Sequence, residues 1–365
     1  MKHIFQKKFY INQTNFTKKI FHDTSIFFDI ETTGFSPVTS FIYLIGCLRR
    51  QNDTLIIDQF LAESKEDEKE ILEQFINLLS EYDTILSFNG IGFDLPFIKA
   101  KCNSYKITNS FDAFQYIDLF KETSKLKPIL KLDNYKQKTV EEFLGIQRED
   151  RYSGGELIPI YEEYQKTHDS YAEELLLLHN FDDVVGMLDL LPILSYARVL
   201  NGEFQIKSTN LCDYTSYDGT QKKEMIITIE NAFTLPKRIS IQNEHHYIIF
   251  DTNETKVRVP VFEGELKFFY DNYKDYYYLP EEDLAIHKSV ATFVDKNYRK
   301  KANAQNCYTR KDSCFLPQFK TFLSPVFKQN YKDKVTYLEL SDDFILSDTK
   351  IKSYIEHIFA YVMQH

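Results

Sequence analysis

The order of predicted elements in the N-terminal half constrains the fold more than any other feature of this chain. Three short apolar runs at 25–30, 41–49 and 54–61 are each bounded by turn-forming residues. Apolar residues then recur at helical spacing behind an acidic first turn, which predicts a helix over 64–82. A fourth apolar run at 84–88 precedes a helix from about Asp94 to Cys102. This order predicts a mixed α/β sheet flanked by helices.

The pattern changes near Leu200. Before this residue, a long helix is predicted over about 171–199, with a kink at Pro192. Beyond it, short alternating runs separated by turn residues are typical of β-strands, and helices are predicted over about 281–304 and 349–363. We therefore expect a basic N-terminal lead segment over 1–22, an α/β domain over 23–200 and a β-rich α+β domain over 201–365.

Charge is unevenly distributed over the 365 residues. Residues 1–22 contain five lysines and no acidic residue, whereas residues 23–200 contain 17 basic and 31 acidic residues, and residues 201–365 contain 22 and 23. An acidic region is a poor general surface for nucleic acid. An acidic pocket that first binds divalent cations is different, because the cations reverse its local charge.

The sequence argues against a membrane protein and against a disulfide-stabilised scaffold. No apolar run reaches the ~18 to 20 residues of a membrane-spanning helix, and charge interrupts the first ten residues before a signal-peptide core could form. The five cysteines are scattered, with neither CxxC spacing nor a cysteine–histidine ladder. We expect a cytoplasmic protein with reduced thiols and no membrane partner.

Two acidic residues lie at the end of the first predicted strand, in the segment DIETTG at 29–34. Because alternate residues of a strand point to the same face, Asp29 and Glu31 can grip one hard cation through oxygen ligands. Two solvated carboxylates at an exposed strand end explain the same pattern.

Two further segments carry polar residues beside apolar ones. The segment NGIGFD at 89–94 follows the fourth predicted strand, and its Asp94 can serve as a helix N-cap or as a ligand. The segment HNFDD at 179–183 lies within the long apolar helix. His179 and Asp183 are four residues apart and share a helix face, which fits either a surface hydrogen bond or a polar cleft beside the core.

The order and spacing of the three segments resemble the three exonuclease motifs of the DEDD superfamily of 3′–5′ exonucleases. More narrowly, residues 25–197 are similar to the YprB-type ribonuclease-H-like exonuclease domain, including the runs LSFNGIGFDLPFI and VEEFLGIQREDRYSGGELIPIYEEY. The resemblance implies a ribonuclease-H-like mixed sheet and a 3′–5′ exonuclease that acts on single-stranded ends of DNA or RNA. Motif matching gives metal-binding roles to Asp29, Glu31, Asp94 and Asp183.

The resemblance also implies a two-metal mechanism with Mg²⁺ or Mn²⁺, in which His179 is the general base that accepts a proton from the attacking water. The superfamily has a histidine five residues before the last aspartate or a tyrosine four before it. Here His179 is four residues before Asp183. This hybrid spacing leaves open the identity of the base and the choice between Asp182 and Asp183.

Substrate contacts are expected from the loops that follow the strands. Thr32, Thr33 and Gly34 are placed to offer hydroxyl groups and backbone amides to a terminal nucleotide. Phe35 could wedge against the base of that nucleotide or pack in the ordinary way. Asn89 could position the nucleotide or simply order its turn.

The C-terminal half contains a basic stretch over 288–320, with eight basic and two acidic residues interleaved with aromatic ones. Such interleaving is typical of single-strand binding, and also of a solvated charged face over an aromatic core. Arg299, Lys300 and Lys301 form its densest part and are candidate substrate contacts.

The alternative to an exonuclease is a catalytically inactive nucleic-acid-binding or assembly module on the same fold. A structure-specific endonuclease is not separable from an exonuclease by sequence.

Overall fold

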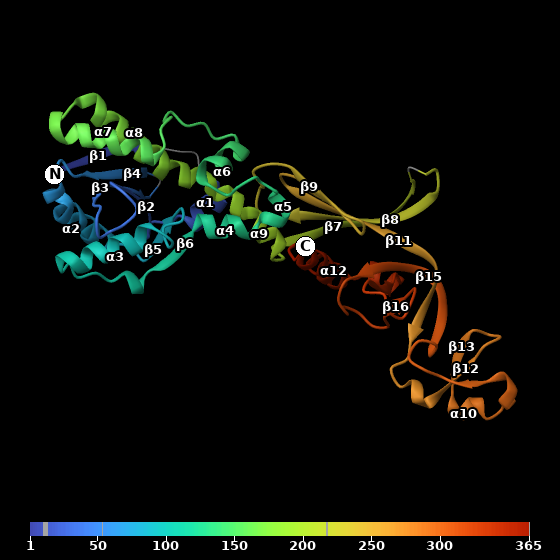
Figure 1. Ribbon diagram of the computed structural model, residues 1–365. Helices are drawn as coiled ribbons and strands as arrows, with labels where there is room; N and C mark the ends of the chain where they lie inside the picture. The colour runs from blue at the N-terminus through green and yellow to red at the C-terminus, as the bar shows by residue number, and fades with distance from the viewer. Residues whose placement is uncertain (10–13, 53, 217, 365) are drawn as a thin grey trace. The chain divides into compact units, whose positions relative to one another are not determined.

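The computed structural model describes residues 1–9, 14–52, 54–216 and 218–364. The chain divides into two compact units, Met1–Ser195 and Tyr196–His365 (Figure 1). Among the described residues, no helix is both long and apolar enough to cross a membrane. The expected fold class is confirmed, because a mixed sheet flanked by helices is followed by a β-rich unit.

A six-stranded mixed sheet forms the centre of the first unit, in the order β1-β4-β3-β2-β5-β6. Its strands are β1 (Lys2–Phe9), β2 (Ser25–Thr32), β3 (Ile42–Gln51), β4 (Thr54–Leu61), β5 (Thr84–Ser87) and β6 (Gln115–Asp118). Strands β1 to β4 pair antiparallel, whereas β2 pairs parallel with β5, and β5 with β6. The carboxyl ends of β2 and β5 therefore meet at one edge of the sheet.

Helices cover both faces of this sheet (Figure 1). The α-helices of this unit are α1 (Asn15–Ile20), α2 (Glu68–Leu79), α3 (Asp94–Tyr105), α4 (Leu119–Lys125), α5 (Lys127–Leu130), α6 (Gln137–Leu144), α7 (Gly154–Thr167) and α8 (Ser170–Leu190). On one face, α2 and α3 pack on a core that includes Phe28 and Ile30 of β2. On the other, α7 and α8 pack on Tyr43, Leu44 and Leu61. The acidic residues of β2 alternate with Phe28 and Ile30 and so face α8.

Residues Lys2–Phe9, within the segment expected to form a basic lead, form strand β1. Strand β1 pairs antiparallel with β4 along most of its length, so it forms the edge of the central sheet. Helix α1 follows, with Phe16 and Ile20 buried. Residues 10–13 lie outside the described residues. The lysines of β1 and α1 therefore belong to a strand and a helix of the first unit.

The long helix predicted over 171–199 is interrupted where the sequence places proline. Helix α8 ends at Leu190, a 3₁₀ turn spans Leu191–Leu194 with Pro192 in its first turn, and α9 spans Ser195–Leu200. Proline lacks the amide hydrogen that an α-helix needs at this point, which explains the break. The division between the two units falls at the start of α9.

The second unit is built on an eight-stranded sheet and a small three-stranded sheet. The strands are β7 (Phe204–Thr215), β8 (Gln221–Asn231), β9 (Ile239–Gln242), β10 (Tyr247–Phe250), β11 (Glu254–Phe269), β12 (Tyr276–Leu279), β13 (Leu284–His287), β14 (Lys300–Lys301), β15 (Tyr308–Gln318), β16 (Phe327–Lys328) and β17 (Thr336–Glu339). Its α-helices are α10 (Lys288–Ala291), α11 (Asp342–Ile345) and α12 (Asp348–Val362). Helix α12 confirms the helix predicted over 349–363.

The helix predicted over 281–304 is wrong. Strands β12 and β13 form an antiparallel hairpin there, followed by the four-residue helix α10 and by β14, which pairs with β12. Asp283 takes the left-handed conformation at φ 51°, which reverses the chain into β13. Cross-strand packing of Tyr276 to Tyr278 therefore outweighs the helical preference of the charged residues that follow.

Candidate active site

The predicted acidic residues converge on one cavity of ≈ 400 Å³ at the carboxyl ends of β2 and β5. The cavity is lined by carboxylates, a histidine and three phenylalanines, together with small and polar loop residues: Asp29, Ile30, Glu31, Phe35, Phe88, Asn89, Phe93, Asp94, Gly154, His179 and Asp183. All five residues predicted to be catalytic are among them. Three segments far apart in the sequence thus form one site.

Asp29 is fixed from α8 by an amide that the sequence patterns did not indicate. The Asn180 amide nitrogen Nδ2 donates to Asp29 Oδ2 at 3.2 Å, and Gln59 Nε2 donates to Asn180 Oδ1 at 3.0 Å. Gly46, opposite Asp29 on β3, makes room for this contact, because a Cβ there would lie 2.0 Å from Asn180 Oδ1. The glycine is therefore required by the close approach of α8 to the sheet.

Asp94 lies in the first turn of α3 and points toward β2. Its Oδ1 accepts a hydrogen bond from the Ile30 backbone amide at 3.3 Å, and no side-chain cap bond is formed at this helix start. The preceding loop is ordered by Asp118, which accepts from the backbone amides of Asn89 at 3.0 Å and Ile91 at 3.2 Å. Asn89 itself has a φ of 62°. The structure therefore supports a role for Asp94 in the cavity and not as an N-cap.

Helix α8 presents His179 and Asp183 to Glu31. The His179 Nε2 atom lies 3.3 Å from Glu31 Oε1 and 3.2 Å from Asp183 Oδ2. One ligand atom from each of the three residues lies within 4.8 Å of the others, a grouping that can hold a metal ion. His179 is only 3% exposed, so this contact is shielded from solvent.

Asp182 and Asp183 have different partners, which addresses the alternative that the sequence left open. Asp182 Oδ2 accepts hydrogen bonds from the backbone amides of Glu149 at 3.0 Å and Asp150 at 2.8 Å. Asp182 thus holds a loop in place, whereas Asp183 lines the cavity beside His179. Of the two aspartates, Asp183 is the one that faces the acidic cavity.

Sequence reasoning missed two charged residues of the 146–153 loop. Asp150 Oδ2 lies 2.8 Å from His179 Nδ1, and burial around this pair is nearly complete. Arg148 pairs with Asp183 through Nη2 and with Glu141 at 3.2 Å. Both residues belong to the run RED at 148–150, which is part of a segment that contributes to the family resemblance. Because their partners lie far away in sequence, no local spacing could have indicated these contacts.

The electrostatics of the cavity are dominated by carboxylates, of which, among the described residues, only Asp183 pairs with an arginine, Arg148. Burial and then three neighbouring carboxylates raise the pKa of Asp29 well above its ordinary value, and burial and neighbouring carboxylates do the same to the pKa of Glu31. Burial also raises the pKa of Asp94 to about 7, against backbone hydrogen bonds that lower it. In the described ranges, no lysine or arginine pairs with any of these three. Clustered buried carboxylates of this kind are typical of functional sites and of cation binding.

The expected substrate contacts divide into two groups. Thr32 Oγ1 donates to the Gly34 carbonyl at 2.9 Å, and Thr33 Oγ1 accepts from the Phe41 amide at 3.1 Å, so both hydroxyls take part in bonds within their own region. A Cβ at Gly34 would lie 2.6 Å from Ser40 Oγ, which indicates a packing role. By contrast, Phe35 and Asn89 line the cavity.

Phe35 is 91% exposed, although its ring lies 6.2 Å from the Phe93 ring in an edge-on arrangement. Ordinary core packing therefore does not explain this residue. Val38, in the same loop, is 90% exposed as well. The loop presents apolar side chains to solvent at the mouth of the acidic cavity.

The basic residues at 299–301 belong to the second unit and are not part of this cavity. Arg299 donates through Nη1 to the Ala291 carbonyl and lies 5.0 Å from the Tyr277 ring. Lys300 and Lys301 are exposed on β14. The two lysines are therefore free of the packing that engages Arg299.

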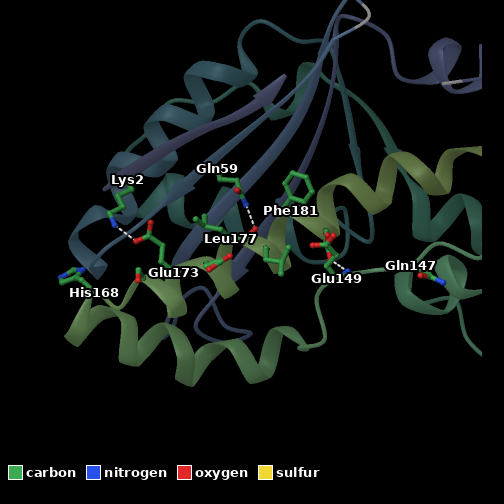
Figure 2. A pocket seen from close by; sticks show the side chains of 12 residues that line it. Lys2, Gln59, Gln147, Glu149, His168, Glu173, Leu177 and Phe181 are labelled. Carbon is green, nitrogen blue, oxygen red and sulfur yellow. Dashed lines mark hydrogen bonds and ion pairs between the residues drawn. The ribbon is translucent and has the colours of Figure 1, made fainter. Parts of the chain in front are cut away.

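A larger cavity of ≈ 770 Å³ also lies along α8 (Figure 2). Its wall includes Asp182, an ion pair between Lys2 and Glu173, and Gln59, which donates to the Leu177 carbonyl at 2.9 Å. It contains none of the four carboxylates predicted to bind metal. Because chemistry depends on converging functional groups and not on volume, the smaller cavity is the candidate active site.

Comparison with known proteins supports the fold. Residues 26–195 match the family model of the RNase_H superfamily, which confirms the ribonuclease-H-like fold expected for the first unit. No curated protein sequence matches the chain. The YprB-type assignment stays a prediction.

Solved structures similar to this chain include nucleic-acid enzymes. One is the family B DNA polymerase from the hyperthermophilic archaeon Pyrobaculum calidifontis, with 18% identity, a TM-score of 0.39, and coverage of 48% of this chain and 26% of the polymerase. Another is E. coli exonuclease I in complex with a dT13 oligonucleotide, with 12% identity, a TM-score of 0.33, and coverage of 57% of this chain and 55% of the exonuclease. This chain thus spans about a quarter and about half of those proteins, respectively.

Proposed function

We propose that this chain is a metal-dependent nuclease that hydrolyses phosphodiester bonds, and specifically a 3′–5′ exonuclease acting on single-stranded ends of DNA or RNA. The observation that carries this proposal is the convergence of Asp29, Glu31, Asp94 and Asp183 on one cavity. The ribonuclease-H-like fold and the resemblance to DEDD exonucleases support it. Direction and strand preference come from the resemblance.

The residues of the cavity fit two divalent cations. Their donors are carboxylate oxygens, which Mg²⁺ and Mn²⁺ prefer, and burial together with the neighbouring carboxylates raises the pKa of both Asp29 and Glu31. Asp29 would be shared between the cations, Glu31 and Asp183 would hold one of them, and Asp94 the other. When bound, such cations make hydroxide available at neutral pH and stabilise charge on the leaving oxygen.

The remaining residues position these ligands and the substrate. Asn180 fixes one oxygen of Asp29, and Arg148 fixes Oδ1 of Asp183, which leaves Oδ2 turned toward His179. Phe35 and Asn89 lie where a terminal nucleotide would enter, and the exposed Phe35 ring offers a stacking face to its base. Nucleic acid is therefore the proposed partner.

The test is digestion of 5′-end-labelled single-stranded DNA and RNA in Mn²⁺, with the products sized over time. A 3′–5′ exonuclease gives a ladder that shortens one nucleotide at a time in at least one of the two substrates. Early internal fragments would instead show an endonuclease. Complete resistance of both substrates would support the alternative, an inactive binding or assembly module.

A further inference from the structure

We propose that His179 is a metal ligand, so that the Nε2 atom of His179 and the carboxylates of Glu31 and Asp183 together hold one cation. The resemblance instead implies that His179 is the general base. The inference rests on the proposed metal-dependent function, because it concerns how one of its cations is held. It is carried by the positions of the three side chains and by the hydrogen bond that orients the imidazole.

The distances match those between neighbouring ligands of one ion. Nitrogen and oxygen ligands about 2.1 Å from a metal are ~3.0 to 3.4 Å apart when they occupy adjacent octahedral or tetrahedral positions. His179 Nε2 lies 3.3 Å from Glu31 Oε1 and 3.2 Å from Asp183 Oδ2. Both separations fall within this range.

Asp150 orients the imidazole for ligation. Its Oδ2 lies 2.8 Å from His179 Nδ1, so Nδ1 donates its hydrogen to this carboxylate and Nε2 is turned toward Glu31 and Asp183. Histidines that bind metals almost always donate their other ring hydrogen to a carboxylate, a carbonyl or water. Asp150 is held in turn by Asp182, which accepts its backbone hydrogen.

The same arrangement is unfavourable for a general base. A base must direct its free ring nitrogen at the water that it deprotonates, whereas Nε2 of His179 faces two carboxylates. A single cation between the three side chains would contact Nε2 and both carboxylates at once.

Imidazole ligation changes the expected metal preference. Nitrogen ligands favour first-row transition metals over Mg²⁺, which binds almost entirely through oxygen. We therefore expect the site to bind Mn²⁺ more tightly than Mg²⁺. The preference should shift toward Mg²⁺ in His179→Asp, which replaces the nitrogen ligand by an oxygen ligand.

The decisive experiment is pulsed electron paramagnetic resonance of the full chain loaded with Mn²⁺, prepared once with natural nitrogen and once with ¹⁵N-histidine. We expect nitrogen modulation in the wild type that changes with ¹⁵N-histidine and is lost in His179→Ala. It should persist in His168→Ala, a histidine on the wall of the larger cavity. Asp150→Asn should weaken Mn²⁺ binding by ~10- to 100-fold, the usual effect of losing such a partner.

The wild-type spectrum decides the question even if a variant fails to fold. Bound Mn²⁺ without histidine nitrogen modulation would overturn the ligand role while leaving the nuclease proposal intact. Nitrogen modulation in a protein that cleaves neither DNA nor RNA would overturn the nuclease proposal and leave the ligand role of His179 intact. Failure of the chain to bind Mn²⁺ at all would overturn both.

Discussion

At the scale of single residues, two adjacent aspartates on α8 serve different parts of the molecule. Asp183 lines the acidic cavity beside His179, whereas Asp182 accepts two backbone hydrogen bonds from the loop that carries Arg148 and Asp150. The loop in turn supplies the partners of His179 and Asp183. Charge and geometry in the cavity thus depend on side chains that do not line it.

We expect Asp183→Asn to lower nuclease activity more than Asp182→Asn does. The first change removes a ligand charge, whereas the second weakens hydrogen bonds to a loop and should act mainly on stability, by ~1 to 3 kcal/mol. Initial rates on labelled single strands and thermal unfolding of both variants measure the two effects. The reverse ranking of rates would mean that Asp182, and not Asp183, is the aspartate of α8 on which activity depends.

At the scale of elements, the close approach of α8 to β3 sets the position of Asp29. We expect Gly46→Ala to cost about 1–3 kcal/mol, because its Cβ would overlap the Asn180 amide. Relief by rotation of Asn180 would break its bond to Asp29. Activity should therefore fall together with the free energy of unfolding.

Gly155→Ala is the matched control for this change, since nothing lies within 4 Å of a Cβ at that position in α7. Alanine there should leave both activity and fold intact. Wild-type activity and stability in Gly46→Ala would contradict the close packing of Asn180 of α8 against Gly46 of β3.

In the second unit, burial, with a further contribution from His245, lowers the pKa of His246 to about 4, and its Nδ1 has no partner among the described residues. The unfolded chain has a histidine pKa of ~6.5, so between pH 6.5 and 4 the unfolded state binds more protons. We expect the stability of this unit to be full above pH 6.5 and to fall with acidification by up to ~1.4 kcal/mol per pH unit from this group.

Denaturant unfolding of the wild type and of His246→Gln across this pH range tests the expectation, with His287→Gln as the control at an exposed histidine. The slope between pH 6.5 and 4 should be shallower in His246→Gln than in the other two proteins. Equal slopes in all three would mean that His246 is not held neutral in the fold.

Local sequence patterns predicted the strands and helices that form the site, because apolar periodicity and acidic first turns act within a few residues. They also identified four carboxylates and a histidine. They did not indicate Asn180, Arg148 or Asp150, whose roles depend on partners brought together by folding. The prediction of a helix over 281–304 was wrong for the same reason, because β14 in this segment pairs with β12, more than 20 residues earlier in the chain.

At the scale of the whole molecule, an acidic unit with the candidate site is joined to a β-rich unit that carries the basic residues at 299–301. We propose that Lys300 and Lys301 contact substrate phosphates, while Arg299, engaged by Ala291 and Tyr277, supports β14. Replacing all three by alanine should weaken single-strand binding. The loss of two phosphate contacts would reduce the slope of the logarithm of affinity against the logarithm of salt concentration by ~1.4.

A salt titration of single-strand binding measures this change, with Lys207→Ala as the control at an exposed lysine paired with Glu254. Cleavage of an already bound end should change little. Identical slopes and affinities for wild type and triple variant would leave the basic stretch as a solvated surface with no part in substrate capture.

The most direct test of the central claim is the rate at which Asp29→Ala shortens 5′-labelled single strands in excess Mn²⁺, with Asp133→Ala as the control at an exposed aspartate. A carboxylate shared by two cations contributes to several kcal/mol of transition-state stabilisation. We expect Asp29→Ala to lose at least about 100-fold in rate while unfolding at a temperature no lower than that of the wild type. A folded Asp29→Ala protein with activity within about threefold of the wild type would contradict the two-metal site.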